Sequence, residues 1–294
     1  MINTDEFRKQ LEDTYKYSTP DTVERSLWHR MFGGLDIVYK SSVIGVILHG
    51  GSMARKGTWN RDSWLNLSLD IWRGVENCGG KFEVSGCEHL KKLDGPAVII
   101  SNHMSLLETF AIPAIVLPFQ HMTFVVKESL THLPLFKDVM MGVRPISLGR
   151  KNPREDLKQF MTEGPKVLEG GRSIVVFPQS TRSVTFKPSE FNSIGAKLAK
   201  KTGVPLVPLA LKTDFHGLGK VVKDFGPVDR SKTVHFKFGP AQAITGNGRD
   251  EQAACSDFIG KTLKSWGGDV EEAESREQGR EGSRSRPMGG MSRA

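Results

Sequence analysis

The fold is decided by a stretch in the middle of the chain, PREDLKQFMTEGPKVLEGG (Pro153–Gly171), which is followed at once by RSIVVFP (Arg172–Pro178). The first part carries a helical pattern and ends in glycine, a common stop for an α-helix. The second part is a short apolar run of the kind that forms a β-strand. A helix that leads directly into a strand is the repeating unit of an α/β fold.

The same alternation extends in both directions from this stretch. A second helical pattern that ends in glycine lies at KPSEFNSIGAKLAKKTG (Lys187–Gly203). The runs rich in strand-forming residues are FEVSG, AVIIS, MTFVVK, RPISLG, RSIVVFP, VPLVPLAL and TVHFKFG. Residues 81–266 are therefore expected to form one α/β domain, with a largely parallel or mixed sheet flanked by helices.

Residues 1–80 are expected to be helical. IVYKSSVIGVILHG (Ile37–Gly50) and WNRDSWLNLSLDIWRGV (Trp59–Val75) are apolar on one side, and a basic, glycine-rich turn joins them. Neither reaches the roughly 18 apolar residues of a membrane-spanning helix. Two interpretations stay open, a pair of ordinary core helices or an amphipathic hairpin that lies in the membrane interface, where tryptophan beside Arg and Lys suits the headgroup layer.

The terminal segments and the composition indicate which partners and which cellular compartment to expect. Residues 267–294 are rich in Glu, Arg, Ser and Gly, and are expected to be a disordered tail. The formal net charge of +8 favours partners with negative surfaces, such as anionic lipid, nucleic acid or phosphorylated small molecules. The three cysteines show no CxxC spacing and the N-terminus has no apolar signal core, so reduced thiols and a cytoplasmic setting are expected.

The stretch SNHMSLLET (Ser101–Thr109) is a candidate for chemistry. Residues five apart in a helix are separated by about 140° around its axis. His103 and Glu108 can therefore meet only if His103 lies in the turn after the preceding strand and the helix begins near Ser105. Ser105 and Glu108 also fit a capping box, so Glu108 could be a proton-transfer partner or simply a helix cap.

Four stretches together resemble a known family. They are NHMSLLE (Asn102–Glu108), VVKESLTHLP with GVRPISLGR (Val125–Pro134 and Gly142–Arg150), FPQSTRS (Phe177–Ser183) and VPLVPLAL (Val204–Leu211). In order and spacing they resemble the four conserved blocks of the glycerolipid acyltransferases, the lysophosphatidic acid acyltransferase family. The resemblance covers roughly Phe82 to Phe238.

The resemblance implies an O-acyltransferase. Such an enzyme moves a fatty acyl group from acyl-CoA or acyl carrier protein to the free hydroxyl of a lysophospholipid, here 1-acylglycerol-3-phosphate, and needs no further cofactor. His103 would be the general base, and Glu108 would fix its tautomer and stabilise the imidazolium. The enzyme would lie on the cytoplasmic face of the membrane as a peripheral or monotopic protein, with its positive charge toward anionic lipid.

The matching blocks also imply a substrate site. Cationic side chains are expected around the acceptor phosphate, because arginine grips phosphate with a bidentate fork and lysine acts as a point charge. The residues assigned to substrate binding are Asn102, Lys127, Arg144, Arg150, Gln179, Ser180, Thr181 and Arg182.

Two departures from the family leave alternatives open. Glu108 stands where aspartate is usual, and Gln179-Ser180 stands where the family has Glu-Gly. The second change puts the acceptor in doubt, so an amino-, sugar- or other glycerolipid stays possible, as do a non-catalytic lipid or carrier-binding protein and a hydrolase. Nucleic acid is not expected because no recognition motif occurs, and no metal is expected because the histidines lack ligand spacing.

Overall fold

The computed structural model describes all residues except 1–2, 33–35, 180, 218, 220–225 and 272–294. Most of the expected disordered tail therefore lies outside the described residues. Its first part differs from that expectation, because Val270 forms a parallel bridge with Phe186 and packs against the core.

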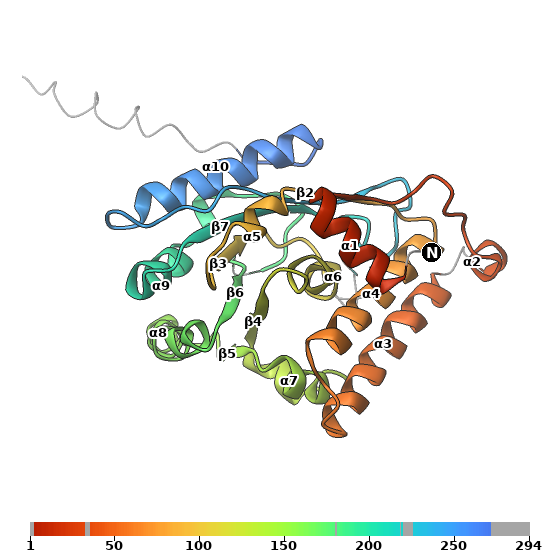
Figure 1. Ribbon diagram of the computed structural model, residues 1–294, viewed down its shortest axis with the longest axis horizontal. Helices are drawn as coiled ribbons and strands as arrows, with labels where there is room; N and C mark the ends of the chain where they lie inside the picture. The colour runs from red at the N-terminus through yellow and green to blue at the C-terminus, as the bar shows by residue number, and fades with distance from the viewer. Residues whose placement is uncertain (1–2, 33–35, 180, 218, 220–225, 272–294) are drawn as a thin grey trace, which may run out of the picture.

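The centre of the molecule is an eight-stranded mixed sheet in the order β1-β2-β8-β7-β3-β6-β4-β5 (Figure 1). The strands are β1 (Tyr17–Ser18), β2 (Phe82–Ser85), β3 (Val98–Ser101), β4 (His121–Lys127), β5 (Ile146–Leu148), β6 (Arg172–Val176), β7 (Leu206–Lys212) and β8 (Val234–Phe238). Strands β7, β3, β6, β4 and β5 run parallel, whereas β8 is antiparallel to β7. The α/β prediction is confirmed.

Helices cover both faces of this sheet (Figure 1). The α-helices are α1 (Thr4–Thr14), α2 (Leu27–Phe32), α3 (Ile37–Arg55), α4 (Arg61–Asn77), α5 (Glu88–Lys91), α6 (Leu107–Val116), α7 (Lys137–Val143), α8 (Pro153–Glu169), α9 (Ile194–Thr202) and α10 (Arg249–Ser265). Short 3₁₀ turns span Glu128–His132 and Pro188–Glu190. Helices α8, α9 and α10 pack on one face, and α4 and α6 pack on the other.

The stretch that decided the fold forms the elements expected of it. Helix α8 has proline in its first turn, Asn152 as its N-cap and Gly170 as its C-cap, and β6 follows directly. All four residues of β3 and all seven of β7 are buried. Continuous burial of this kind is typical of central strands with helices on both faces.

The N-terminal segment is not a separate helical layer. Strand β1 pairs with β2, so residues 17–18 extend the sheet. The apolar side of α4 belongs to the main core, where Trp72 is 1% exposed, stacks on Phe82 with ring centroids 3.8 Å apart and donates from Nε1 to the Ala111 carbonyl. The tryptophan-rich helix is thus a core helix, and the prediction that it lies in the membrane interface is wrong for α4.

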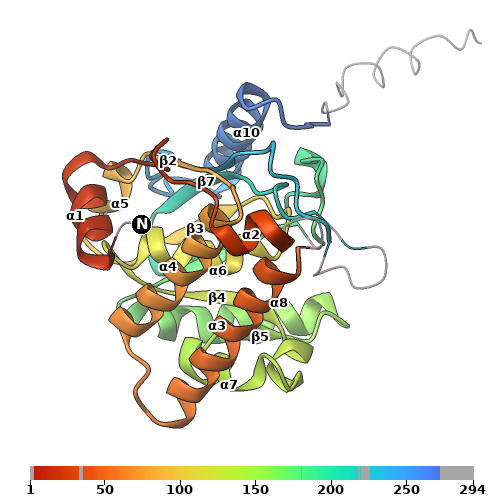
Figure 2. The ribbon, with the colours of Figure 1, turned by 90° about the vertical axis from the view of Figure 1, so that its right-hand side faces the viewer.

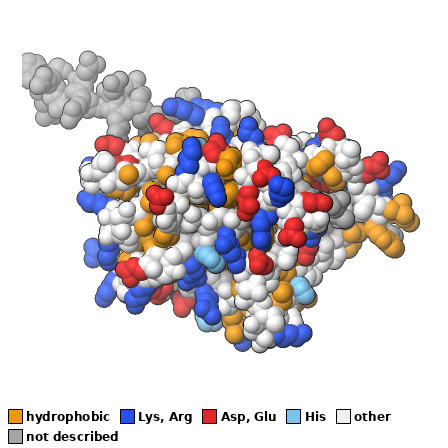
Figure 3. All heavy atoms as spheres, in the orientation of Figure 1, with side chains coloured by type: hydrophobic (Ala, Val, Ile, Leu, Met, Phe, Trp, Pro, Cys, Tyr) orange, Lys and Arg blue, Asp and Glu red, His pale blue; other side chains and the backbone are white. Residues whose placement is uncertain are grey.

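Exposed apolar side chains lie instead on α2 and α3, which pack side by side (Figures 2 and 3). Their exposed members are Leu27, Trp28, Met31, Ile37 and Leu48. Helix α3 runs five residues beyond its predicted apolar stretch, and within the described part of the chain it is the one helix long and apolar enough to cross a membrane. Only 28% of its apolar window is buried, although it packs on α4 and α7.

Candidate active site

The candidate site lies where the parallel strands end. Because the carboxyl ends of β3, β4, β5, β6 and β7 meet at one edge of the sheet, the residues that follow these strands converge there. They are His103 after β3, Lys127 at the end of β4, Arg150 after β5, Gln179 after β6 and Thr213 after β7.

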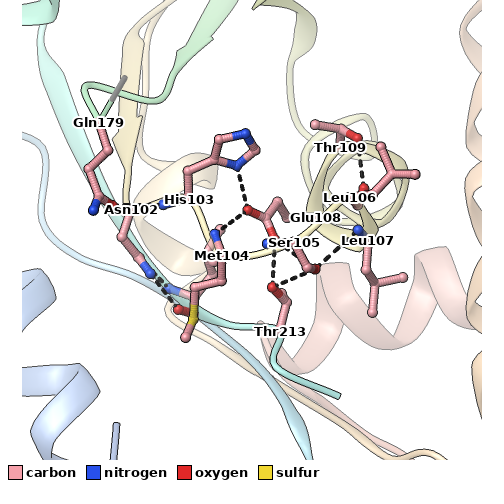
Figure 4. Close-up of polar contacts among 11 residues, drawn as sticks. Asn102, His103, Met104, Ser105, Leu106, Leu107, Glu108, Thr109, Gln179 and Thr213 are labelled. Carbon is pink, nitrogen blue, oxygen red and sulfur yellow. Dashed lines mark hydrogen bonds and ion pairs between the residues drawn. The ribbon is translucent and has the colours of Figure 1, made fainter. Parts of the chain in front are cut away.

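His103 and Glu108 are in direct contact (Figure 4). Helix α6 begins at Leu107, so His103 lies in the turn between β3 and the helix, as its proposed contact with Glu108 required. The Nδ1 atom of His103 lies 2.6 Å from Oε1 of Glu108. Glu108 is fully buried, whereas the His103 side chain keeps 11% of its surface exposed.

Glu108 also orders the turn that precedes α6. Its carboxylate accepts hydrogen bonds from the backbone N–H groups of Met104 (2.7 Å) and Ser105 (2.9 Å), and from the hydroxyls of Ser105 and Thr213. Burial alone would raise the pKa of Glu108, but the hydrogen bonds from His103, Thr213 and Ser105 outweigh it and hold the pKa below its usual value. Glu108 is therefore the partner of His103, whereas the predicted capping box with Ser105 as N-cap is not formed, because the N-cap residue of α6 is Leu106 and its side chain makes no capping hydrogen bond.

An ionised Glu108 determines which ring nitrogen of His103 can act as a base. A carboxylate only accepts hydrogen bonds, so Nδ1 carries the proton that it donates to Glu108. Nε2 is then the unprotonated nitrogen. It points away from Glu108 (Figure 4) and has no hydrogen-bond partner among the described residues.

The segment after β6 holds His103 from three sides. The ring of Phe177 stacks on the imidazole, with centroids 4.2 Å apart and planes at 17°. Oε1 of Gln179 accepts from the backbone N–H of His103 at 3.0 Å, and the N–H of Ser183 donates to the His103 carbonyl at 2.9 Å. The third sequence block therefore positions the histidine of the first.

Arg150 and Arg182 share this site. Burial lowers the pKa of Arg182, the charge of Glu108 opposes that shift and the charge of Arg150 adds to it, so Arg182 lies within electrostatic reach of both. Arg150 itself adopts a left-handed backbone conformation (φ 57°), which is uncommon for a residue other than glycine. Arg182, half-buried near the carboxylate of Glu108, and the exposed Arg150 suit an anionic ligand.

The chain is similar to known acyltransferases. Residues 81–212 match the family model named Acyltransferase. These residues form an acyltransferase domain. The chain is 29% identical to a 1-acyl-sn-glycerol-3-phosphate acyltransferase of Pseudomonas aeruginosa over 186 residues, which is 63% of this chain and 68% of that protein.

Two other relatives extend the comparison. The chloroplastic 1-acyl-sn-glycerol-3-phosphate acyltransferase LPAT1 of Arabidopsis thaliana is 31% identical over 145 residues, 48% of this chain and 38% of that protein. The crystal structure of the 1-acyl-sn-glycerophosphate (LPA) acyltransferase of Thermotoga maritima matches with a TM-score of 0.56 and 20% identity, over 81% of this chain and 93% of that one. The structural match concerns the fold.

Two of the residues that were assigned to the substrate site from the sequence do not lie there as expected. Both amide atoms of Asn102 are engaged with the backbone of Leu211, at 2.8 and 3.0 Å, so this side chain fastens β3 to β7. Arg144 precedes β5, and its carbonyl accepts from Arg172 at the start of β6. It therefore lies at the opposite edge of the sheet from His103, and its assignment to the site is wrong.

The remaining assigned residues are placed as follows. Lys127 is exposed at the carboxyl end of β4, and Thr181 is exposed beside Arg182. Ser180 lies outside the described residues. Gln179 is almost fully buried and turned toward the backbone of His103, so it supports the base.

Two residues of the site were missed from the sequence. Thr213 follows the predicted strand VPLVPLAL, and the rule that parallel strands end at one edge could have identified it. His216 lies in the next loop, with Nδ1 3.3 Å from the Tyr39 hydroxyl of α3. Burial lowers the pKa of His216 to about 4, with a further lowering by the charge of Lys40 and a smaller opposing effect of Glu108, and no local pattern marks this histidine.

Proposed function

We propose that the protein transfers a fatty acyl group from a thioester to the free hydroxyl of 1-acylglycerol-3-phosphate, giving phosphatidic acid. The observation that carries the proposal is the buried His103–Glu108 pair, set beside two arginines at the carboxyl edge of the sheet. The named relatives supply the acceptor, since each is a 1-acyl-sn-glycerol-3-phosphate acyltransferase.

In the proposed reaction the acceptor hydroxyl approaches Nε2 of His103. Nε2 takes the hydroxyl proton while the oxygen forms a bond to the thioester carbonyl carbon, giving a tetrahedral intermediate. The carbon–sulfur bond then breaks, and the departing thiolate recovers the proton from Nε2. Glu108 keeps its charge throughout and stabilises the transient imidazolium, as the acid does in hydrolase triads.

Arg150 and Arg182 are proposed to bind the acceptor phosphate. Their guanidinium groups offer paired N–H donors that fit phosphate oxygens, and the partial burial of Arg182 strengthens its attraction for an anion. Lys127 would add a third positive charge from the end of β4. The phosphate would thereby be held on one side of His103, and the hydroxyl of the same molecule could reach Nε2.

The change from glutamate to Gln179 is compatible with a phosphate acceptor. The Gln179 amide oxygen accepts a hydrogen bond from the backbone N–H of His103. Replacing glutamate by glutamine at this position therefore affects how His103 is positioned. A neutral side chain here also leaves one fewer negative charge near the phosphate. Other lysolipids stay testable acceptors, because Ser180 replaces the usual glycine in the same block.

An apolar crevice between α3, α4, α6 and α7 is the proposed site for an acyl chain. Ile47, Leu67, Ile71, Phe110 and Val139 line it, and Phe110 is two residues from Glu108 along α6. Its open space is about 30 Å³, room for about one water molecule. A chain would therefore enter only as the helices move apart.

The exposed apolar side chains of α2 and α3 are proposed to lie on the cytoplasmic face of the membrane. Leu27, Trp28 and Met31 are each about two-thirds exposed, and Figure 3 shows apolar side chains projecting from this end of the molecule. Apolar area of this kind drives insertion into the headgroup layer, and the net positive charge favours anionic lipid. The protein would be peripheral or monotopic, and its lipid substrate would lie in the same membrane surface.

The decisive experiment assays purified protein against a panel of lysolipids with acyl-CoA and acyl carrier protein as donors, and identifies products by mass. Wild type should yield phosphatidic acid, and His103→Ala should abolish transfer while the circular dichroism spectrum is unchanged. His132→Ala is the matched control, because His132 is an exposed loop histidine. Free fatty acid without acylated lipid would indicate a hydrolase, and an inert wild type that binds lysolipid would indicate a binding protein.

A further inference from the structure

Helix α3 contacts the loop that follows β7 (residues 213–217) through a buried tyrosine. Tyr39 lies in the first turn of α3 and is 1% exposed. Its hydroxyl lies 3.3 Å from Nδ1 of His216, and the two rings meet edge to face with centroids 5.8 Å apart. Burial raises the pKa of Tyr39, so the hydroxyl stays protonated and can donate to Nδ1. The tyrosine therefore favours the tautomer of His216 in which Nδ1 is the acceptor.

A second contact joins the start of α3 to the segment that pairs with this loop. Asp36 occupies the N-cap position of α3, but its side chain makes no capping hydrogen bond. Its carboxylate instead accepts from the backbone N–H of Val228 at 3.0 Å and from the guanidinium of Arg230 at 2.6 Å. Val228 forms an antiparallel bridge with His216. An aspartate at this position commonly caps its own helix, so here its carboxylate serves to fasten α3 to the loop instead.

His216 is three residues from a side chain that holds the carboxylate of the candidate site. Its backbone N–H donates to the Thr213 carbonyl at 3.1 Å, which closes a tight turn. The Thr213 hydroxyl donates to Oε2 of Glu108 and accepts from the Ser105 hydroxyl at 2.9 Å (Figure 4). Oε1 of the same carboxylate contacts Nδ1 of His103. The contacts thus run without a gap from α3 to the imidazole of the base.

The linking side chains are buried, which makes these contacts consequential. Thr213 and Glu108 are fully buried, and His216 is 3% exposed. When a buried hydrogen bond is lost, its partner is left unsatisfied and no water replaces it at low cost, so neighbouring groups shift to recover the interaction. A catalytic group must be held within about 0.5 Å of its productive geometry. A small displacement of the turn at Thr213 should therefore be felt at His103.

We infer that Tyr39 and His216 are positioning residues for acyl transfer, which hold Thr213 and through it the carboxylate that orients His103. The inference rests on the proposed acyl transfer and adds two residues to it, both acting through that carboxylate. It also gives α3 a second role. The helix carries Ile37 on its exposed side and Tyr39 on its buried side, so the element proposed to contact lipid also supports the base.

The test compares Tyr39→Phe with Tyr17→Phe as a matched control. Both variants remove one buried hydroxyl and keep the ring, but the Tyr17 hydroxyl donates to Glu76 of α4 at 2.7 Å. Tyr39→Phe should lower kcat by about 10- to 100-fold and leave KM for the acceptor unchanged, because the base is displaced while the phosphate site is kept. Tyr17→Phe should keep the wild-type kcat, although both variants lose thermal stability. Equal kcat values in the two variants would overturn the inference.

Variants of His216 show whether the tyrosine acts through this residue. His216→Leu removes the acceptor and should lower kcat as Tyr39→Phe does, and the double variant should be no worse than either single variant. His216→Asn places an amide oxygen near the position of Nδ1 and should retain most of the activity. Additive losses in the double variant, or an Asn variant as poor as the Leu variant, would contradict the inference. If His216→Leu fails to fold, the two tyrosine variants decide the question by themselves.

A proton resonance reports the same effect without turnover. The Nδ1 proton that His103 donates to Glu108 should give a low-field signal in the NMR spectrum, which disappears in His103→Ala. Tyr39→Phe should shift or broaden this signal, and Tyr17→Phe should leave it unchanged. An unaltered signal in Tyr39→Phe would show that the tyrosine does not position the pair. A wild type that shows these changes but transfers no acyl group from any donor would contradict the proposed function alone.

Discussion

At the scale of single residues, Glu108 has two roles that usually fall to different side chains. It satisfies N–H groups in the turn that precedes α6 and it orients His103, both through one buried carboxylate. The same hydrogen bonds that order the turn therefore fix the tautomer of the base. This sharing explains why the histidine and the acid stand five residues apart, which a continuous helix would not allow.

Glu108→Gln should damage both activity and stability. The NH₂ group of glutamine can only donate, so it cannot accept the hydrogen bonds that one carboxylate oxygen of Glu108 accepts. At least one N–H or O–H donor therefore loses its partner, and His103 loses the negative charge that orients it. We expect kcat to fall by about 10²- to 10⁴-fold and the thermal midpoint to drop. Thr213→Val is the control, because it removes a hydroxyl that donates to Glu108 and accepts from Ser105 but leaves the His103–Glu108 contact in place, and it should have a much smaller effect. Equal activity of wild type and Glu108→Gln would contradict the assignment.

Gln179 offers a second test at this scale, through the pH dependence of turnover. Gln179→Glu keeps an oxygen for the His103 N–H but adds a buried negative charge, which favours the imidazolium form of the base. The acid limb of the kcat profile should then move to higher pH. Gln179→Leu removes the acceptor, so kcat should fall without that movement. A profile that moves equally in both variants would show that charge is not the cause.

At the scale of elements, the helices of the N-terminal segment divide into core and surface. The apolar face of helix α4 packs in the core, whereas α2 and α3 carry apolar side chains that are more than half exposed. A helical period identifies an apolar face but cannot name what covers it. For that reason the sequence left both interpretations of the hairpin open.

Two tryptophans separate these roles experimentally. Trp72→Ala should destabilise the protein by about 3–5 kcal/mol, because it removes a fully buried ring from the core. Trp28→Ala should leave the free energy of unfolding nearly unchanged, because that residue is 65% exposed, but should weaken binding to anionic vesicles. Chemical denaturation and vesicle flotation measure the two effects. If Trp28→Ala retained full vesicle binding, the proposed lipid face would be wrong.

At the scale of the whole molecule, the sequence predicted the strands and helices of the α/β domain, because each has its own local pattern. It missed β1, whose two residues are too few to show a pattern, and it could not order the strands. It placed Arg144 with Arg150 because they are near in sequence. The structure separates them across β5, since residues before and after a parallel strand lie at opposite edges of the sheet.

His216 contacts Tyr39 of α3 and should make the free energy of unfolding depend on pH. Its pKa of about 4 in the folded protein lies below the ordinary value of 6.5, because burial disfavours the charged ring. As the pH falls below 6.5, His216 therefore binds a proton in the unfolded chain but stays neutral in the folded protein. The free energy of unfolding should decline from pH 6.5 toward 4, at up to about 1.4 kcal/mol per pH unit from this group.

His216→Gln provides the comparison for this acid sensitivity. Glutamine cannot take up a proton, so urea unfolding at a series of pH values should give a shallower decline between pH 6.5 and 4 than wild type. A residual slope is expected, because burial also lowers the pKa of His89 and His235, and the lowered pKa of Glu108 adds a further loss at more acid pH. Identical slopes in wild type and variant would mean that His216 is not held neutral between α3 and the catalytic pair.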